Sequence, residues 1–171
     1  MNHKISCTIN GESFTATVNV RKSLLEVLRE NGYIGVKEGC GVGECGACTV
    51  LLDEVPVDSC LYLAIWADGR SIRTIEGESR DGSLSTVQQA YLDTGAVQCG
   101  FCTPGLIMTS TAFVEKNMGK TVTRDQIRKY HAGNLCRCTG YEGIIRAVEK
   151  CLSDKDGETN TVISKTCDID T

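Results

Sequence analysis

The sequence is poor in aromatic residues, proline and net positive charge. Only 5% of its 171 residues are aromatic, two are proline, and the formal net charge is −4. A negative chain without a basic stripe does not favour nucleic acid as a partner. No run of 18 apolar residues is present to span a membrane. The first residues, MNHKISCTINGESF, lack the apolar core and cleavage site of a secretory signal, so we expect a cytoplasmic protein.

Cysteine is abundant where a reducing compartment makes a disulfide framework unexpected. The chain has eleven cysteines, and metal ligation is the usual alternative to disulfides in such a compartment. Eight of them fall into two groups of four, the first being Cys40, Cys45, Cys48 and Cys60 and the second Cys99, Cys102, Cys136 and Cys138. The grouping predicts two metal sites.

The first group has the spacing C-x4-C-x2-C, followed by eleven residues and a fourth cysteine, which is typical of plant-type 2Fe–2S ferredoxins. Glycines between the cysteines allow backbone N–H groups to approach the sulfurs of an anionic cluster. Structural zinc is the alternative, but its ligands usually come as two C-x2-C pairs. The first group therefore indicates an iron–sulfur cluster.

The second group is C-x2-C, then 33 residues, then C-x-C. Its spacing leaves structural zinc open. Both pairs are expected just before a helix, with Thr103 and Thr139 as the capping residues. The unpaired N–H groups of a helix start favour an anion such as a thiolate or a cluster. We therefore expect a second cluster at this place.

Patterning predicts an α+β protein with two domains. In residues 1–76, a strand at 4–9, a hairpin turn at Asn10-Gly11, a helix capped by Ser23 and further strands give the order of a β-grasp ferredoxin domain. Residues 76–84 are polar and predict the boundary. Residues 83–152 predict a four-helix bundle that binds the second cluster, with helices starting at Ser85, Thr103, Thr123 and Thr139. Residues 153–171 have no period and predict a disordered tail.

The remaining candidates suggest no chemistry of their own. Cys7 and Cys151 fall on apolar faces and are expected in the core, whereas Cys167 lies in the tail. His131 is expected at the surface or at a helix cap, and the acidic residues on the solvated surface. No nucleotide-binding or nucleophile motif is present, so we predict an electron carrier without catalytic residues.

The segments GCGVGECGACTV, QCGFCTPG and GNLCRCTGY resemble those of the iron–sulfur subunit of the molybdenum hydroxylases, the xanthine oxidase family. The resemblance runs from about residue 4 to residue 152. The segment DSCLYLAIWADGRSIRTIEGE is further similar to that of small subunits of bacterial xanthine dehydrogenases. The resemblance implies a large partner subunit with molybdopterin, a medium subunit with FAD, and electron flow from molybdenum through two clusters toward FAD. It also implies that Gln98 hydrogen-bonds the pterin and that Cys138 is both an iron ligand and a pterin neighbour.

Three functions follow. The first is the electron-transfer subunit of a molybdenum hydroxylase acting on a purine such as xanthine or hypoxanthine, or else on an aldehyde, nicotinate or another N-heterocycle. The second is a free-standing ferredoxin with two clusters. The third is a metal-stabilised adaptor or redox sensor.

Overall fold

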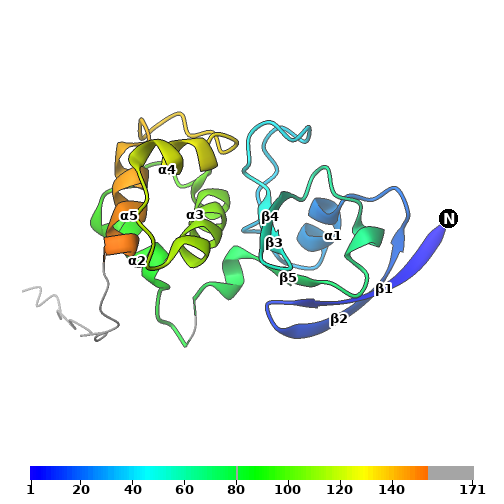
Figure 1. Ribbon diagram of the computed structural model, residues 1–171. Helices are drawn as coiled ribbons and strands as arrows, with labels where there is room; N and C mark the ends of the chain where they lie inside the picture. The colour runs from blue at the N-terminus through cyan, green and yellow to red at the C-terminus, as the bar shows by residue number, and fades with distance from the viewer. Residues whose placement is uncertain (80, 154–171) are drawn as a thin grey trace, which may run out of the picture.

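The computed structural model describes residues 1–79 and 81–153. Figure 1 shows a sheet and a helix that packs on it, beside a group of helices. The elements, in chain order, are β1 (Asn2–Ile9), β2 (Glu12–Asn19), α1 (Leu24–Glu30), β3 (Thr49–Leu52), β4 (Val55–Asp58), β5 (Ser71–Arg73), α2 (Thr86–Asp93), α3 (Thr103–Asn117), α4 (Arg124–Tyr130) and α5 (Glu142–Ser153). Short 3₁₀ helices occupy Ala64–Ala67 and Ile75–Gly77.

The N-terminal domain is a five-stranded mixed sheet in the order β2-β1-β5-β3-β4. Strand β1 runs parallel to β5, and the other neighbours are antiparallel. The β1–β2 hairpin turns at Asn10 and Gly11, whose φ angles of 54° and 87° fit a two-residue type I′ turn. This confirms the hairpin predicted from the sequence.

One face of β1 and the apolar side of α1 form much of the core of this domain. Ile5, Cys7 and Ile9 are buried, as their alternation predicts. Helix α1 begins with the predicted capping box, in which Ser23 and Glu26 satisfy each other's backbone N–H groups. The arrangement agrees with the predicted β-grasp fold.

The four predicted helices of the C-terminal domain are present. Capping boxes at Ser85 and Thr123 start α2 and α4 as expected. The prediction that Thr103 caps α3 is wrong, because Cys102 occupies the N-cap and Thr103 is the first helical residue. Helix α4 ends at Tyr130.

The prediction that Thr139 caps the last helix is also wrong. Helix α5 begins at Glu142. Tyr141 has a φ of 67°, a left-handed conformation that a right-handed helix does not admit. The Thr139 hydroxyl instead accepts a hydrogen bond from the Tyr141 N–H at 3.2 Å and lies 3.1 Å from the Cys136 sulfur.

Helix α3 is the element shared by the two domains. It lies between the other helices and strands β3 and β4 (Figure 1). All ten residues from 105 to 114 are buried, so the helix packs on more than one face. The face of α3 that is turned toward the sheet carries Met108 and Ala112, which pack against Leu51 of β3.

The structure also places the cysteines outside the two groups, His131 and the acidic residues. Cys7 and Cys151 are core residues, as expected. His131 is the C-cap of α4, which confirms the capping alternative of its prediction, and it is buried with 4% of its surface exposed. Glu78 is buried as well, against the prediction for acidic residues, because it lies against Arg73 and Thr111. The tail with Cys167 lies outside the described residues, apart from Ser153 in α5.

Candidate iron–sulfur centres

The first cysteine loop, between α1 and β3, directs backbone N–H groups at a sulfur. The N–H groups of Val42 and Glu44 donate to the Cys40 Sγ at 3.4 and 3.3 Å. These two bonds lower the pKa of the Cys40 thiol to about 7. The loop therefore stabilises negative charge on this sulfur before any cluster is considered.

Glycines are required in this loop for two reasons. Gly41, Gly43 and Gly46 have φ angles of 69°, 75° and 65°, a region that favours glycine. Gly39 has no unusual φ, but a Cβ there would lie 2.7 Å from the Cys45 sulfur. The glycines thus shape a loop whose backbone closely approaches the sulfurs.

The four sulfurs of the first group lie in two pairs. Cys45 is beside Cys40 and contributes to its lowered pKa. Cys48 is buried at the start of β3 and lies beside Cys60. Burial first, and then the neighbouring Cys60, raise the pKa of the Cys48 thiol to about 12.

The second group also forms two pairs. Each pair combines one cysteine from the segment before α3 with one from the segment after α4. Cys102, at the N-cap of α3, lies beside Cys136, and Cys99 lies beside Cys138. Burial and the neighbouring Cys136 raise the pKa of Cys102 to about 12. The Cys99 and Cys102 pair directly precedes α3, as expected. The Cys136 and Cys138 pair does not directly precede α5, because residues 139–141 lie between Cys138 and that helix.

Cys136 receives the hydrogen bonds that favour a thiolate in the second group. The Thr139 N–H donates to its sulfur at 3.5 Å, and the Thr139 hydroxyl lies 3.1 Å away. Burial raises the pKa of Cys136, but the hydrogen bonds from Thr139, together with those from the Cys138 backbone and the Cys102 side chain, lower it overall. The opposite holds for Cys138, whose pKa is raised by the adjacent Cys99.

The donor sets fit 2Fe–2S clusters. Each iron of such a cluster needs two protein thiolates, and each group supplies two pairs of neighbouring sulfurs. Within residues 1–79 and 81–153, no three His, Cys, Asp or Glu side chains are close enough to hold a single metal ion. Paired sulfurs therefore suit a two-iron object better than one tetrahedral zinc.

The two cysteine loops touch each other. The Leu135 N–H, next to Cys136, donates to the Cys45 carbonyl oxygen at 2.9 Å. The two loops lie at the same edge of the molecule (Figure 1, the cyan loop before β3 and the yellow-orange loop after α4). A path of covalent bonds and one hydrogen bond thus connects Cys45, a predicted ligand of the first cluster, with Cys136, a predicted ligand of the second.

Gln98 is exposed beside Cys99, and Cys99 and Cys138 are exposed as well. The second group therefore opens toward solvent on the side where the resemblance places the pterin. The sequence did not predict the contacts that three residues make around this group. Tyr141 accepts a hydrogen bond from the Cys136 N–H, Thr139 contacts the Cys136 sulfur, and Asn134 links the two loops. Their only sequence signal is proximity to Cys136 and Cys138.

Family comparisons agree with this arrangement. Residues 7–71 match the "2Fe-2S iron-sulfur cluster binding domain" and residues 74–149 match the "[2Fe-2S] binding domain". The xanthine dehydrogenase iron-sulfur-binding subunit of Escherichia coli O157:H7 is 57% identical over 91% of this chain and all of its own length. The chain belongs to the iron–sulfur subunits of the molybdenum hydroxylase family.

Other members of the family act on different compounds. The nicotinate dehydrogenase small FeS subunit of Eubacterium barkeri is 47% identical, over 87% of this chain and 97% of its own. The structure of quinoline 2-oxidoreductase from Pseudomonas putida 86 superimposes with a TM-score of 0.82 at 44% identity, over 86% of this chain and 90% of that one.

Membership in the molybdenum hydroxylase family establishes the general role. The chain is the electron-transfer subunit of a molybdenum-dependent oxidoreductase, it carries two 2Fe–2S clusters, and it works with a large partner subunit. Among the described residues, no helix has both the length and the hydropathy needed to cross a bilayer.

Proposed function

We propose that Cys40, Cys45, Cys48 and Cys60 hold one cluster in a domain formed by residues 1–76, and that Cys99, Cys102, Cys136 and Cys138 hold the other in a domain formed by residues 83–152. The pairing of sulfurs within each group supports these ligand sets. The bound clusters supply one-electron redox chemistry. The protein contributes N–H groups that stabilise the thiolates and a fixed contact between the two loops.

The second cluster is assigned to the molybdenum side of the complex. Its loops expose Gln98 and Cys138, the two residues that the family resemblance places against the pterin. Electrons then leave toward the first cluster and on to FAD, which we assign to a separate medium subunit.

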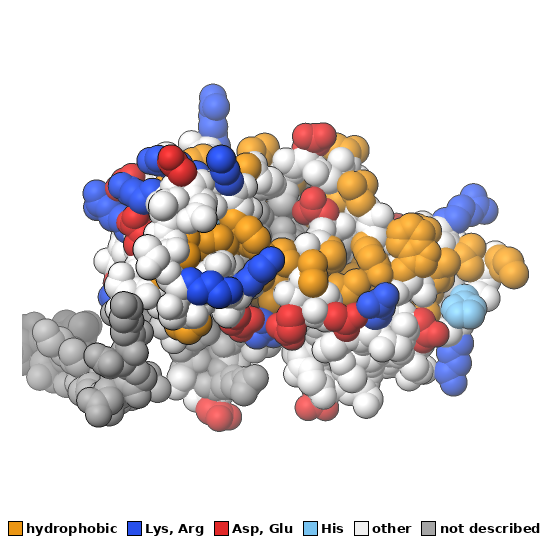
Figure 2. Space-filling model, viewed as in Figure 1, with side chains coloured by type: hydrophobic (Ala, Val, Ile, Leu, Met, Phe, Trp, Pro, Cys, Tyr) orange, Lys and Arg blue, Asp and Glu red, His pale blue; other side chains and the backbone are white. Residues whose placement is uncertain are grey.

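Exposed apolar side chains support docking surfaces at both cysteine groups. Val42, Phe101 and Leu135 each lie between or beside predicted ligands and are 62%, 50% and 56% exposed. Figure 2 shows hydrophobic side chains gathered across one face, over both domains. Apolar surface of this kind commonly marks a protein interface. We assign the complex to the cytoplasm, since the eight proposed cysteine ligands serve best where thiols stay reduced.

We infer a purine such as xanthine or hypoxanthine as the substrate. The 57% identity to a xanthine dehydrogenase subunit favours a purine over the nicotinate of the 47% identical relative. The substrate itself binds the large subunit, so an aldehyde or another N-heterocycle is the second candidate. Activity of the purified complex toward xanthine, nicotinate and an aldehyde, measured with one artificial acceptor, decides among them.

Metal analysis tests the ligand sets. We expect four iron and four sulfide per chain, and two distinguishable electron paramagnetic resonance (EPR) signals after reduction, because the two scaffolds donate different hydrogen bonds. One zinc and one cluster would overturn the second ligand set. Co-purification with a molybdopterin-binding chain is expected; a stable single chain that exchanges electrons with several separate enzymes would instead indicate a free-standing ferredoxin.

A further inference from the structure

Asn134 is a buried polar residue at the contact between the two cysteine loops. It is 6% exposed and precedes Cys136 by two residues. Its Oδ1 accepts a hydrogen bond from the Thr109 hydroxyl at 2.9 Å. Its Nδ2 donates to the Gly46 carbonyl at 3.0 Å and to the Thr49 hydroxyl at 3.2 Å. One side chain thus binds α3, the first cysteine loop and the start of β3.

These bonds hold the peptide group next to the one that carries the contact between the loops. Gly46 directly follows Cys45, whose carbonyl accepts the Leu135 N–H at 2.9 Å. The backbones pack too tightly for any side chain at this point. A Cβ on Gly46 would lie 2.7 Å from the Gly133 oxygen, and a Cβ on Gly105 would lie 2.1 Å from the Gly46 oxygen.

Other contacts already join the two domains at a distance from the ligands. Leu51 packs against Met108 and Ala112, and Arg73 forms a bidentate pair with Glu115. Asn134 is therefore not required to dock the domains. Among these contacts, it is the one that lies beside predicted ligands of both groups. Its partners Gly46 and Thr49 directly follow Cys45 and Cys48, and Asn134 itself precedes Cys136 by two residues.

We propose that Asn134 is a positioning residue for electron transfer between the two clusters. By fixing the Gly46 peptide, it keeps the Cys45 carbonyl on the Leu135 N–H and sets the separation of the two ligand loops. The inference rests on the ligand sets proposed above. The step moves one electron, oxidising the cluster of the second group and reducing that of the first, and no bond or proton is exchanged.

The test compares Asn134→Ala with Asn117→Ala in the complete complex. Asn117 also donates from its side-chain amide, to the Phe113 carbonyl, but at the far end of α3. We expect both variants to keep wild-type iron and sulfide. Only Asn134→Ala should weaken the magnetic coupling between the reduced clusters and speed hydrogen exchange of the Leu135 amide. Because the step depends on distance, we expect its stopped-flow rate to fall roughly tenfold to a hundredfold.

If Asn134→Ala loses a cluster, a milder pair of variants at Thr109 tests the same proposal. Thr109→Val removes the hydroxyl that orients the Asn134 amide, and Thr109→Ser retains it. We expect Thr109→Val to reduce the coupling and the rate, and Thr109→Ser to restore both. Wild-type coupling, rate and Leu135 exchange in a fully loaded Asn134→Ala or Thr109→Val complex would overturn the proposal. Absence of either cluster from the wild-type complex would instead refute the ligand sets.

Discussion

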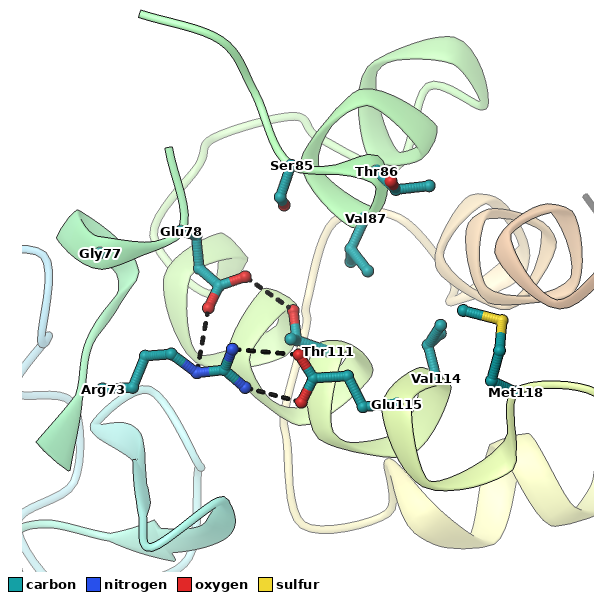
Figure 3. Close-up of a pocket in the computed structure, with 10 residues that line it drawn as sticks. All are labelled: Arg73, Gly77, Glu78, Ser85, Thr86, Val87, Thr111, Val114, Glu115 and Met118. Carbon is teal, nitrogen blue, oxygen red and sulfur yellow. Dashed lines mark hydrogen bonds and ion pairs between the residues drawn. The ribbon is translucent and has the colours of Figure 1, made fainter. Parts of the chain in front are cut away.

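Arg73 of β5 and Glu115 of α3 join the two domains through a bidentate ion pair with N–O distances of 3.0 and 2.7 Å. Figure 3 shows the Arg73 guanidinium between Glu115 and Glu78, beside a pocket of about 280 Å³. The Glu78 side chain is only 4% exposed, and its carboxylate lies 3.6 Å from the Arg73 Nε. Burial raises the pKa of Glu78 although Arg73 opposes the shift. Arg73 therefore provides the countercharge for a buried acid.

Arg73→Ala should destabilise the protein by about 3 kcal/mol at neutral pH, because it leaves a buried carboxylate without its cation. Urea unfolding of the complex, followed by circular dichroism, measures the loss. Removing Arg73 raises the folded-state pKa of Glu78 further above its unfolded value, so stability falls as pH rises between the two values. The loss should therefore be smaller at pH 5 than at pH 8.

Two further variants control the Arg73 experiment. Adding Glu78→Gln to Arg73→Ala should recover part of the stability, since no buried charge then remains. Arg128→Ala removes an exposed pair with Asp125 and should change stability by at most about 0.5 kcal/mol. Equal losses for Arg73→Ala and Arg128→Ala would contradict the assignment of Arg73 as a buried countercharge.

Gly46→Ala in the first cysteine loop should disturb the second cluster as well. Its methyl group would lie 2.4 Å from the Asn134 Nδ2 and 2.7 Å from the Gly133 oxygen, across the domain contact. Gly41→Ala is the matched control, because Gly41 also has a positive φ but has no atom within 4 Å of an added Cβ. It should cost about 1 to 2 kcal/mol of backbone strain only. We expect Gly46→Ala to change both EPR signals. Gly41→Ala should change no signal other than that of the first cluster.

Cys138→Ser should alter the second cluster and leave the first intact. Serine is a harder donor than thiolate, so the potential of that cluster should fall and turnover of the complex should slow. Cys151→Ser is the control, since Cys151 packs in the core of the C-terminal domain and its replacement should cost about 1 kcal/mol. EPR and stopped-flow kinetics measure both effects. If Cys151→Ser removed a cluster signal while Cys138→Ser kept both, the second ligand set would have to include Cys151.

The buried His131 ring should make stability depend on pH. Its Nδ1 lies 2.8 Å from the Ile127 carbonyl, which only accepts, so Nδ1 carries the proton and Nε2 accepts from Ser110 at 2.8 Å. Burial lowers the pKa of His131 below its usual 6.5. Below pH 6.5 the unfolded chain binds the proton first, so stability should fall from that pH downward until the folded-state pKa is reached.

The measurement is the urea midpoint from pH 8 to pH 5. His131→Gln should be less stable but should lose the part of the slope that the histidine contributes, whereas His3→Gln at the exposed N-terminus should keep it. The titratable or charged groups facing this site are Tyr130, Arg128 and Glu142, with Tyr91 across Ser110. An unchanged slope in His131→Gln would assign the pH dependence to one of these or to the clusters.

Local signals in the sequence predicted much of the fold. The capping boxes at Ser23, Ser85 and Thr123 and the Asn10-Gly11 turn depend on neighbouring residues only, and each forms as predicted. Cysteine spacing likewise indicated the two groups, because ligands of one cluster must meet wherever the chain folds. Thr139 failed as a cap because Tyr141 takes a left-handed conformation and the hydroxyl is used at Cys136.

Tertiary partners account for what the sequence did not predict. His131 and Glu78 look like surface residues until Ser110 and Arg73 are brought against them by α3 and β5. Asn134 carries no local pattern, and its role follows only from partners in the first cysteine loop and α3. Contacts between segments distant in the chain have no signature in a single sequence.

The burial of α3 bears on how this protein can evolve. Because residues 105–114 are covered by helices on one side and by the sheet on the other, each domain would expose buried apolar side chains if the other were removed. A recombination event that separated the halves would expose Met108 and Leu51 together. We therefore expect the two domains to stay together in evolution. They should be inherited, fused to larger chains or transferred between genomes only as one unit.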